Sequence, residues 1–337
     1  MLSRVADSIY WMQRYRERAE NIARLIDVNL FLSIDAPGDD EQQWQPIVRT
    51  TGEYSLFEKY YGKPTEKNVL EFLTFDERNP NSILNCVFHA RENARSVREV
   101  ITLDMWHVLN TLYLFVRKAA SSSGRKIKSA DEFYSHIRRS CQLFTGVMDT
   151  TLSHDEGWHF GRLGNLLERA DQSSRILDVK YYILLPSAEQ VGTPYDDILW
   201  SALLRSVSGL EMYRRLWHEI HHSHVIDFIV LNRQFPRAIH SCLYRAKESL
   251  KVIGFDPIET GGETPLQMVE RLCAELESLT VYDIVKIGLH EFLEQLQSKI
   301  SRISNGIYTA YFAPLPAQGI HAPEEVLNGV QGGTEQS

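Results

Sequence analysis

Two stretches of the sequence carry nearly the same charged pattern, 151 residues apart. "ERAENIARLIDV" runs from Glu17 to Val28, and "ERADQSSRILDV" runs from Glu168 to Val179. Carboxylates can act as general bases or hydrogen-bond acceptors, and arginines pair bidentately with carboxylates or phosphates. The candidate residues for ligand binding, or for a network between the two stretches, are Arg14, Glu17, Arg18, Glu20, Asn21, Arg24, Glu168, Arg169, Asp171 and Arg175.

Three interpretations of these residues are open. They could form solvated pairs at i,i+4 spacing, each worth a few tenths of a kcal/mol. They could form a buried arginine–carboxylate network that holds two parts of the chain together. They could also line a polar cleft that binds an anionic or peptide-like ligand. We expect Arg14 and Arg24 to point away from the apolar stripe and meet a ligand, whereas Arg18 borders that stripe. The residues alone assign no catalytic role.

Helical periodicity predicts the elements that must position these side chains. Residues 2–32 form a long amphipathic pattern with one apolar stripe. Strand-like alternation is absent at convincing length, which predicts an all-α fold. Further helices are expected at about 79–101, 104–120, 130–152, 156–184, 196–217, 237–252, 265–278 and 282–312.

The repetition extends beyond the charged stretches. "NPNSILNCVFHAREN" (79–93) resembles "FPRAIHSCLYRAKES" (235–249) at an offset of 156, and Trp44 matches Trp200 at the same offset. Near the two ends, "TGVMDT" (145–150) resembles "NGIYTA" (305–310). These collinear matches predict an internal duplication, 1–152 and 153–312, packed as a helical bundle about a pseudo-two-fold axis. Residues 313–337 are rich in Pro, Gly and polar residues, and we expect a disordered tail.

Composition argues against several classes of protein. A net charge of −8 disfavours a dedicated nucleic-acid binder, and no apolar run approaches the roughly 20 residues that span a bilayer. Four widely spaced cysteines indicate reduced thiols in a cytoplasmic protein. No glycine-rich phosphate loop is present, so no cofactor is expected.

One motif resembles a zinc site. "HEIHH" (218–222) fits the H-E-x-x-H pattern, in which two histidines one helical turn apart bind zinc. At the repeat offset of 156, however, His218 falls opposite Gly62 in "YGKPTEKN", which cannot be a helix interior. We therefore interpret the motif as a loop or a helix end, and expect no metal.

Three segments resemble the bacterial alpha-E domain family. They are "LSRVADSIYWMQRYRERAENIARLIDV", "GRLGNLLERADQSSRILDV" and "DFIVLNRQFPRAIHSCL", and the resemblance covers roughly residues 1–312. Ala238 departs from the family pattern, where serine is expected. The resemblance implies an all-helical protein whose gene lies beside, or is fused to, that of a circularly permuted ATP-grasp ligase.

This resemblance implies a function in a cytoplasmic system that forms or processes amide bonds. The leading hypothesis is a helical partner of an ATP-grasp amide ligase that binds or positions a peptide-like substrate. One alternative is an enzyme in its own right, acting on peptides through carboxylate and arginine groups of the two matching helices. A weaker alternative is a purely structural assembly module.

Overall fold

A computed structural model describes residues 1–35, 40–121, 129–184, 194–254 and 262–313. The described residues form helices and connecting loops, with no strand among them, as the all-α prediction requires. No helix in these ranges is both long and apolar enough to cross a membrane. The expected disordered tail, 313–337, lies outside the described residues except for Ala313.

The helices follow one another with short connections. The first seven are α1 (Ser3–Asp35), α2 (Asp40–Thr50), α3 (Tyr54–Tyr61), α4 (Glu66–Thr74), α5 (Ile83–Ser96), α6 (Leu103–Ser121) and α7 (Ala130–Thr151). The rest are α8 (Glu156–Leu184), α9 (Pro194–Ser206), α10 (Leu210–Leu216), α11 (His222–Ile226), the π-helical η2 (Asp227–Leu231), α12 (Ile239–Ile253), α13 (Pro265–Ser278), α14 (Val281–Ile287), α15 (Leu289–Ile307) and the π-helical η3 (Tyr308–Phe312).

Local chemistry explains where these helices begin and end. The Ser82 side chain accepts from the backbone N–H of Asn85 and caps α5. The expected helix at 196–217 is interrupted around Ser208, which has a φ of 52°. The expected helix at 282–312 is interrupted at Gly288, whose φ of 101° suits glycine alone.

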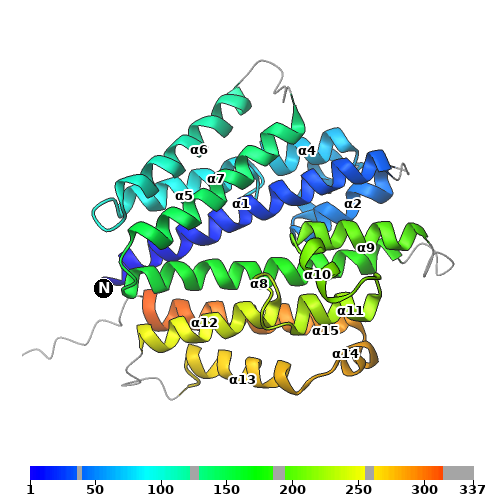
Figure 1. The fold of residues 1–337 in the computed structure, drawn as a ribbon. Coiled ribbons are helices and arrows are strands. Elements are labelled where there is room, and N and C mark those ends of the chain that lie inside the picture. Colours follow the sequence, from blue (N-terminus) through cyan, green and yellow to red (C-terminus); the bar gives the residue numbers. More distant parts are fainter. Residues whose placement is uncertain (36–39, 122–128, 185–193, 255–261, 314–337) are drawn as a thin grey trace, which may run out of the picture.

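Two long helices lie side by side at the centre of the molecule, α1 and α8 (Figure 1). They run parallel, because contacts advance along both together: the amino group of Met1 lies 2.7 Å from Glu156, and Arg18 lies 2.7 Å from Glu168. Helices α5 and α7 pack on α1, while α12 and α15 pack on α8. Each long helix is therefore enclosed by several neighbours.

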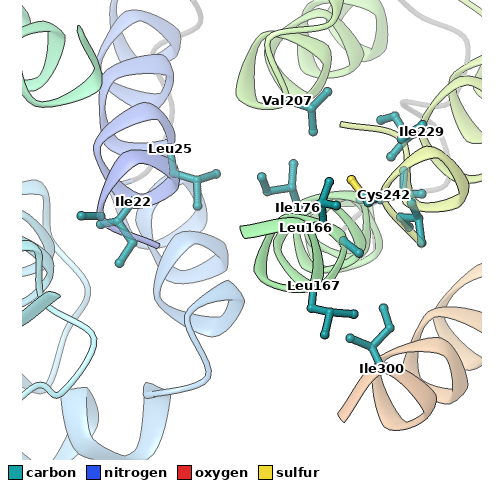
Figure 2. Packing of buried hydrophobic residues seen from close by; sticks show 14 of the residues in the cluster. Ile22, Leu25, Leu166, Leu167, Ile176, Val207, Ile229, Cys242 and Ile300 are labelled. Atoms are coloured by element: carbon teal, nitrogen blue, oxygen red, sulfur yellow. The ribbon is translucent and has the colours of Figure 1, made fainter. Parts of the chain in front are cut away.

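Apolar side chains fill the spaces between these helices. Figure 2 shows part of this core, with Ile22 and Leu25 on α1, Leu167 and Ile176 on α8, and Ile300 on α15; all are at most 4% exposed. Burying an aliphatic side chain of this size stabilises the fold by about 1.5–3 kcal/mol. This apolar packing surrounds the polar contacts between α1 and α8.

The helices of the two predicted repeats come in a similar order. In the first half, α6 packs on α5 and α7, which pack on α1; in the second, α13 packs on α12 and α15, which pack on α8. This arrangement is what the sequence repeat leads one to expect. The internal duplication itself stays a prediction, because only a superposition of 1–152 on 153–312 would test it.

A glycine allows α1 and α8 to approach closely. A Cβ atom at Gly164 of α8 would lie 2.4 Å from the backbone oxygen of Tyr10 on α1, which is far inside contact distance. The helices would have to separate to accommodate any side chain at this position.

We therefore expect Gly164→Ala to lower the free energy of unfolding by about 1–3 kcal/mol through overpacking. Gly146→Ala on α7 is the matched control, since a Cβ there has no neighbour within 4 Å. The control should stabilise the protein by about 0.5–1 kcal/mol, because alanine is the better helix former. Urea unfolding measures both changes, and equal effects of the two variants would contradict a tight crossing.

Candidate functional site

Helix α1 buries a group of charged residues near its middle. Arg16, Glu17, Glu20, Asn21 and Arg24 are each at most 1% exposed. Because α5, α7 and α8 all pack on α1, side chains on several of its faces are removed from water. Within the helix, Arg16 donates to Glu17 (3.1 Å) and to Glu20 (3.2 Å), and Arg24 donates to Glu20 and Asn21.

The contacts across the α1–α8 interface are reciprocal. Arg169 pairs bidentately with Glu17 (3.0 and 3.0 Å), and Arg18 pairs bidentately with Glu168 (2.7 and 3.0 Å). Each helix thus supplies a glutamate to the other's arginine. This crossed pairing is what a two-fold relation between the two stretches would produce.

A second set of contacts has the same reciprocity. Arg14 donates to Glu168 at 2.9 Å, and Asn165, the residue 151 positions after Arg14, donates to Glu17 at 2.8 Å. The two contacts differ in charge, because α8 has the neutral Asn165 at the position where α1 has Arg14.

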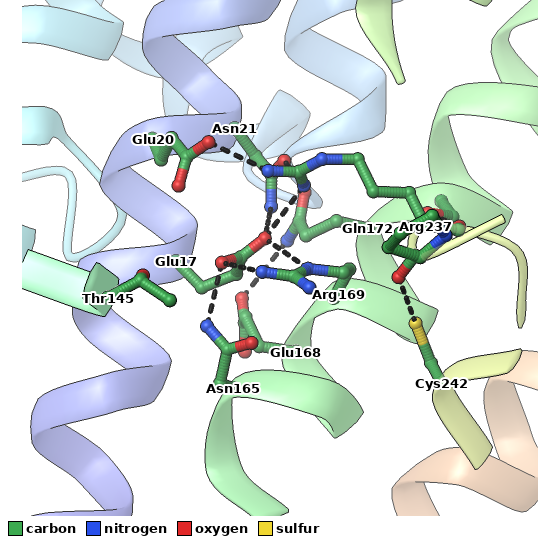
Figure 3. Close-up of polar contacts among 12 residues, drawn as sticks. Glu17, Glu20, Asn21, Thr145, Asn165, Glu168, Arg169, Gln172, Arg237 and Cys242 are labelled. Carbon is green, nitrogen blue, oxygen red and sulfur yellow. Dashed lines mark hydrogen bonds and ion pairs between the residues drawn. The ribbon is translucent and has the colours of Figure 1, made fainter. Parts of the chain in front are cut away.

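Arg237, just before α12, completes the network. Its guanidinium donates to Glu17 (2.8 Å), to Glu20 (2.7 Å) and to Asn21 (3.2 Å), as Figure 3 shows. We call the whole assembly the ion layer: Arg14, Arg16, Glu17, Arg18, Glu20, Asn21, Arg24, Asn165, Glu168, Arg169 and Arg237.

Cations outnumber anions in the ion layer. Six guanidinium groups face the three carboxylates of Glu17, Glu20 and Glu168, a net charge of +3 when all are ionised. Burial raises the pKa of Glu168, but Arg18 and Arg14 outweigh it and hold that pKa at about 2. Burial, together with nearby Arg237, lowers the pKa of Arg24 to about 9. The excess of positive charge thus lowers the pKa of Glu168, and it adds to the effect of burial on Arg24.

Of the three interpretations of the repeated charges, the structure agrees with the buried arginine–carboxylate network, because the pairs Arg18–Glu168 and Arg169–Glu17 lie between packed helices. Asp171 and Arg175 form the pair that most resembles a solvated one: 2.8 Å, with side chains 17% and 33% exposed. The expectation that Arg14 and Arg24 are free to meet a ligand is wrong. Arg24 is 1% exposed and Arg14 is 11% exposed, because the neighbouring helices cover α1 beyond its apolar stripe.

A cleft of about 360 Å³ opens beside the ion layer, between α1, α7, α8 and α12. We call it the arginine cleft, and its charged and amide lining residues are Gln13, Arg16, Asp149, Arg162, Asn165, Arg169 and Arg245. Arg162 lies 5.2 Å from the Trp158 ring. Neither Arg162 nor Arg245 forms an ion pair with the described residues, although Asp149 and Glu248 attract Arg162 at longer range. Burial and nearby Arg245 lower the pKa of Arg162. Such a cleft can bind a carboxylate or phosphate group.

Sequence reasoning missed Arg16, Arg237, Arg162 and Arg245. None of the four has an arginine counterpart in the other half, so comparison of the repeats gave no signal for them. Arg237 was visible in the "FPR" segment, where the matching residue is Asn81.

The other motifs do not form sites among the described residues. His218 of "HEIHH" lies in the loop between α10 and α11, as expected, and no group of metal-binding side chains occurs in the described ranges. The four cysteines are buried and unpaired, and burial raises the pKa of the Cys86 thiol to about 12. They therefore serve as apolar packing.

These observations define an all-α protein whose two long parallel helices are joined by a buried layer of arginine and glutamate. The chain belongs to the Alpha-E family, described as "a predicted alpha-helical domain with a conserved ER motif", whose model matches residues 1–312. We interpret the dipeptides Glu17–Arg18 and Glu168–Arg169 as two copies of this motif, because their crossed pairing joins α1 to α8.

Relatives in mycobacteria are much longer than this chain. Uncharacterized proteins of Mycobacterium bovis and Mycobacterium tuberculosis are 23% identical to it over 326 residues, covering 91% of this chain and 35% of each relative. The chain therefore spans about a third of the length of the curated relatives it matches. No solved structure matches the chain.

Removal of one arginine from the crossed pairs should be costly. We expect Arg169→Ala or Arg18→Ala to lower the free energy of unfolding by roughly 3–5 kcal/mol, because each leaves a buried carboxylate short of a partner. Arg95→Ala is the control: Arg95 is 62% exposed and pairs with Glu92, so its loss should cost less than about 1 kcal/mol. Urea melts that show three equally small losses would refute a desolvated layer.

The ion layer should also make stability depend on acid pH. The folded pKa of Glu168, about 2, lies below its ordinary value of 4.5, so its stabilising contribution is present above pH 4.5 and is lost as the pH falls through about 2. The loss should be about 3 kcal/mol, and Glu17, whose pKa is also lowered, adds to it. Urea unfolding across this range measures the slope. Glu168→Gln should have a shallower slope, and an unchanged slope would count against this assignment.

Proposed function

We propose that this chain is a helical partner of a circularly permuted ATP-grasp amide ligase, and that it binds an acidic part of the ligase's peptide-like substrate in the arginine cleft. The observation that carries the proposal is the cleft itself. Four guanidinium groups and one carboxylate line it, and Arg162 and Arg245 have no ion-pair partner among the described residues.

The arginine cleft differs from another basic groove, between α13 and α15. There, Arg271 pairs with Glu263 at 2.8 Å and Lys299 pairs with Glu275, so acidic neighbours balance the positive charge. In the arginine cleft, the cation-rich ion layer forms the inner wall instead. An incoming carboxylate would supply the missing counter-charge to Arg162 and Arg245.

The buried glutamates favour binding over catalysis by these residues. A general base works best when its pKa lies near the operating pH. The pKa values of Glu17 and Glu168 are held far below that range, and both carboxylates already accept several hydrogen bonds. Their role is to fix the arginines that face the cleft.

The ligase partner is supported by the family and by the length of the relatives. The matched region is 35% of each mycobacterial relative, which is what fusion of this unit to a further domain would produce. The resemblance to the alpha-E family implies that such a domain would be an ATP-grasp ligase.

Co-expression with the neighbouring ATP-grasp protein tests the proposal, followed by an amide-ligation assay on acidic peptides. Omission of this chain should lower the rate at least about tenfold. Arg162→Gln and Arg245→Gln should each raise KM for the acidic peptide about tenfold, the loss of one charged hydrogen bond, with circular dichroism unchanged.

Arg302→Gln provides the matched control, since it removes an exposed arginine from the other basic groove. It should leave ligation unchanged. A ligase equally active without this chain would refute the partnership, and cleft variants with the same KM as the control would refute the cleft as the binding site.

A further inference from the structure

The ion layer has an arginine from the second half of the chain against α1, but no equivalent arginine from the first half against α8. We call these the filled side and the open side. On the filled side, the guanidinium of Arg237 contacts Glu17, Glu20 and Asn21. The residue 156 positions earlier, in the matching segment before α5, is Asn81. Its shorter side chain ends at Arg18, from which it accepts a hydrogen bond (2.7 Å), and at Glu53, to which it donates (3.0 Å).

A cavity of about 220 Å³ lies where an arginine at position 81 would reach α8. We call it the Asn81 cavity; its charged and amide lining residues are Arg18, Glu53, Asn81, Asp171, Gln172 and Arg175. Two of these correspond to residues that Arg237 contacts: shifting by 151 takes Glu20 to Asp171 and Asn21 to Gln172.

The Asn81 cavity presents hydrogen-bond acceptors that lack donors. Asp171 accepts from Arg175 through Oδ2, Gln172 donates through Nε2 to Glu168, and Glu53 accepts from Asn81 through Oε1. Among the described residues, no donor reaches Asp171 Oδ1, Gln172 Oε1 or Glu53 Oε2. The cavity is therefore suited to a group that donates several hydrogen bonds.

The side of the ion layer that lacks an arginine has one more carboxylate than the side that contains Arg237. Glu53 adds a carboxylate to the cavity, whereas the residue 156 positions later is Gly209. The side without its own arginine thus has the extra carboxylate.

The arginines already in the cavity do not prevent a further cation from binding. Arg18 is occupied by Glu168, and Arg175 by Asp171. On the filled side, Arg24 and Arg237 share the carboxylate of Glu20, so two guanidinium groups can occupy equivalent positions.

We propose that the Asn81 cavity binds a guanidinium or primary ammonium group of a ligand, in the position that corresponds to the Arg237 guanidinium. Asp171, Gln172 and Glu53 would accept its hydrogen bonds. The arginine side chain of a peptide and the ammonium group of a lysine share this chemistry. This site is separate from the arginine cleft and does not depend on the ligase partnership.

Calorimetric titration of the full chain with N-acetyl-arginine amide and N-acetyl-lysine amide tests the proposal and distinguishes the two sources. At least one should bind, while N-acetyl-glutamine amide should not. Asp171→Asn should weaken binding about tenfold or more, since a charged hydrogen bond is lost. Asn81→Arg should fill the cavity with the chain's own side chain, abolish binding and raise Tm.

Two controls keep the outcome interpretable. Asp104→Asn makes the same chemical change at an exposed carboxylate on α6 that lines neither the Asn81 cavity nor the arginine cleft, so it should leave binding unchanged. Asn81→Ala keeps the acceptors of Asp171 and Gln172 and should still bind. Absence of binding up to about 10 mM would overturn the proposal. Preference for N-acetyl-glutamate amide, or equal weakening by Asp171→Asn and Asp104→Asn, would do so as well.

Discussion

Three glutamates removed from water between α1 and its neighbours impose the main constraint on this structure. A buried carboxylate is costly unless charged donors surround it, and Glu17 and Glu168 each find theirs on the opposite long helix. Replacing such layers by apolar side chains often leaves stability unchanged, so their value lies in specificity. The planar fork of Arg169 fits Glu17 in one alignment of the helices, and a slide of one turn, about 5.4 Å, would separate them.

Two openings of different character flank this layer. In the arginine cleft, Arg162 and Arg245 form no ion pair with the described residues, although Asp149 also lines the cleft. In the Asn81 cavity, Asp171, Gln172 and Glu53 each have an acceptor atom that meets no donor from the described residues, because asparagine stands where the other half has arginine. Both arise where the two halves of the sequence differ, while the crossed pairs between them arise where the halves agree. Shared residues hold the helices together, whereas the two openings are lined where the halves diverge.

The sequence was sufficient to predict the helical fold and the central role of the two charged stretches, because helical periodicity and repetition are local signals. The sequence did not predict that Arg24 is buried. A single apolar stripe predicts one buried face of α1, whereas α5, α7 and α8 all pack on this helix. The helices α2 to α4 are short and have too few turns for a clear period. Arg237 could not be placed, because its partners lie more than 200 residues earlier and depend on how α12 packs on α8.

The position of Arg237 in the chain has a consequence for biosynthesis. When residues 1–152 have emerged from the ribosome, Glu17 and Glu20 are outside it, but Arg169 and Arg237 have not yet emerged. Of the arginines that pair with these two carboxylates in the folded protein, only Arg16 and Arg24, on the same helix, are then present. The pairing between helices can therefore close only after α8 and the start of α12 have followed.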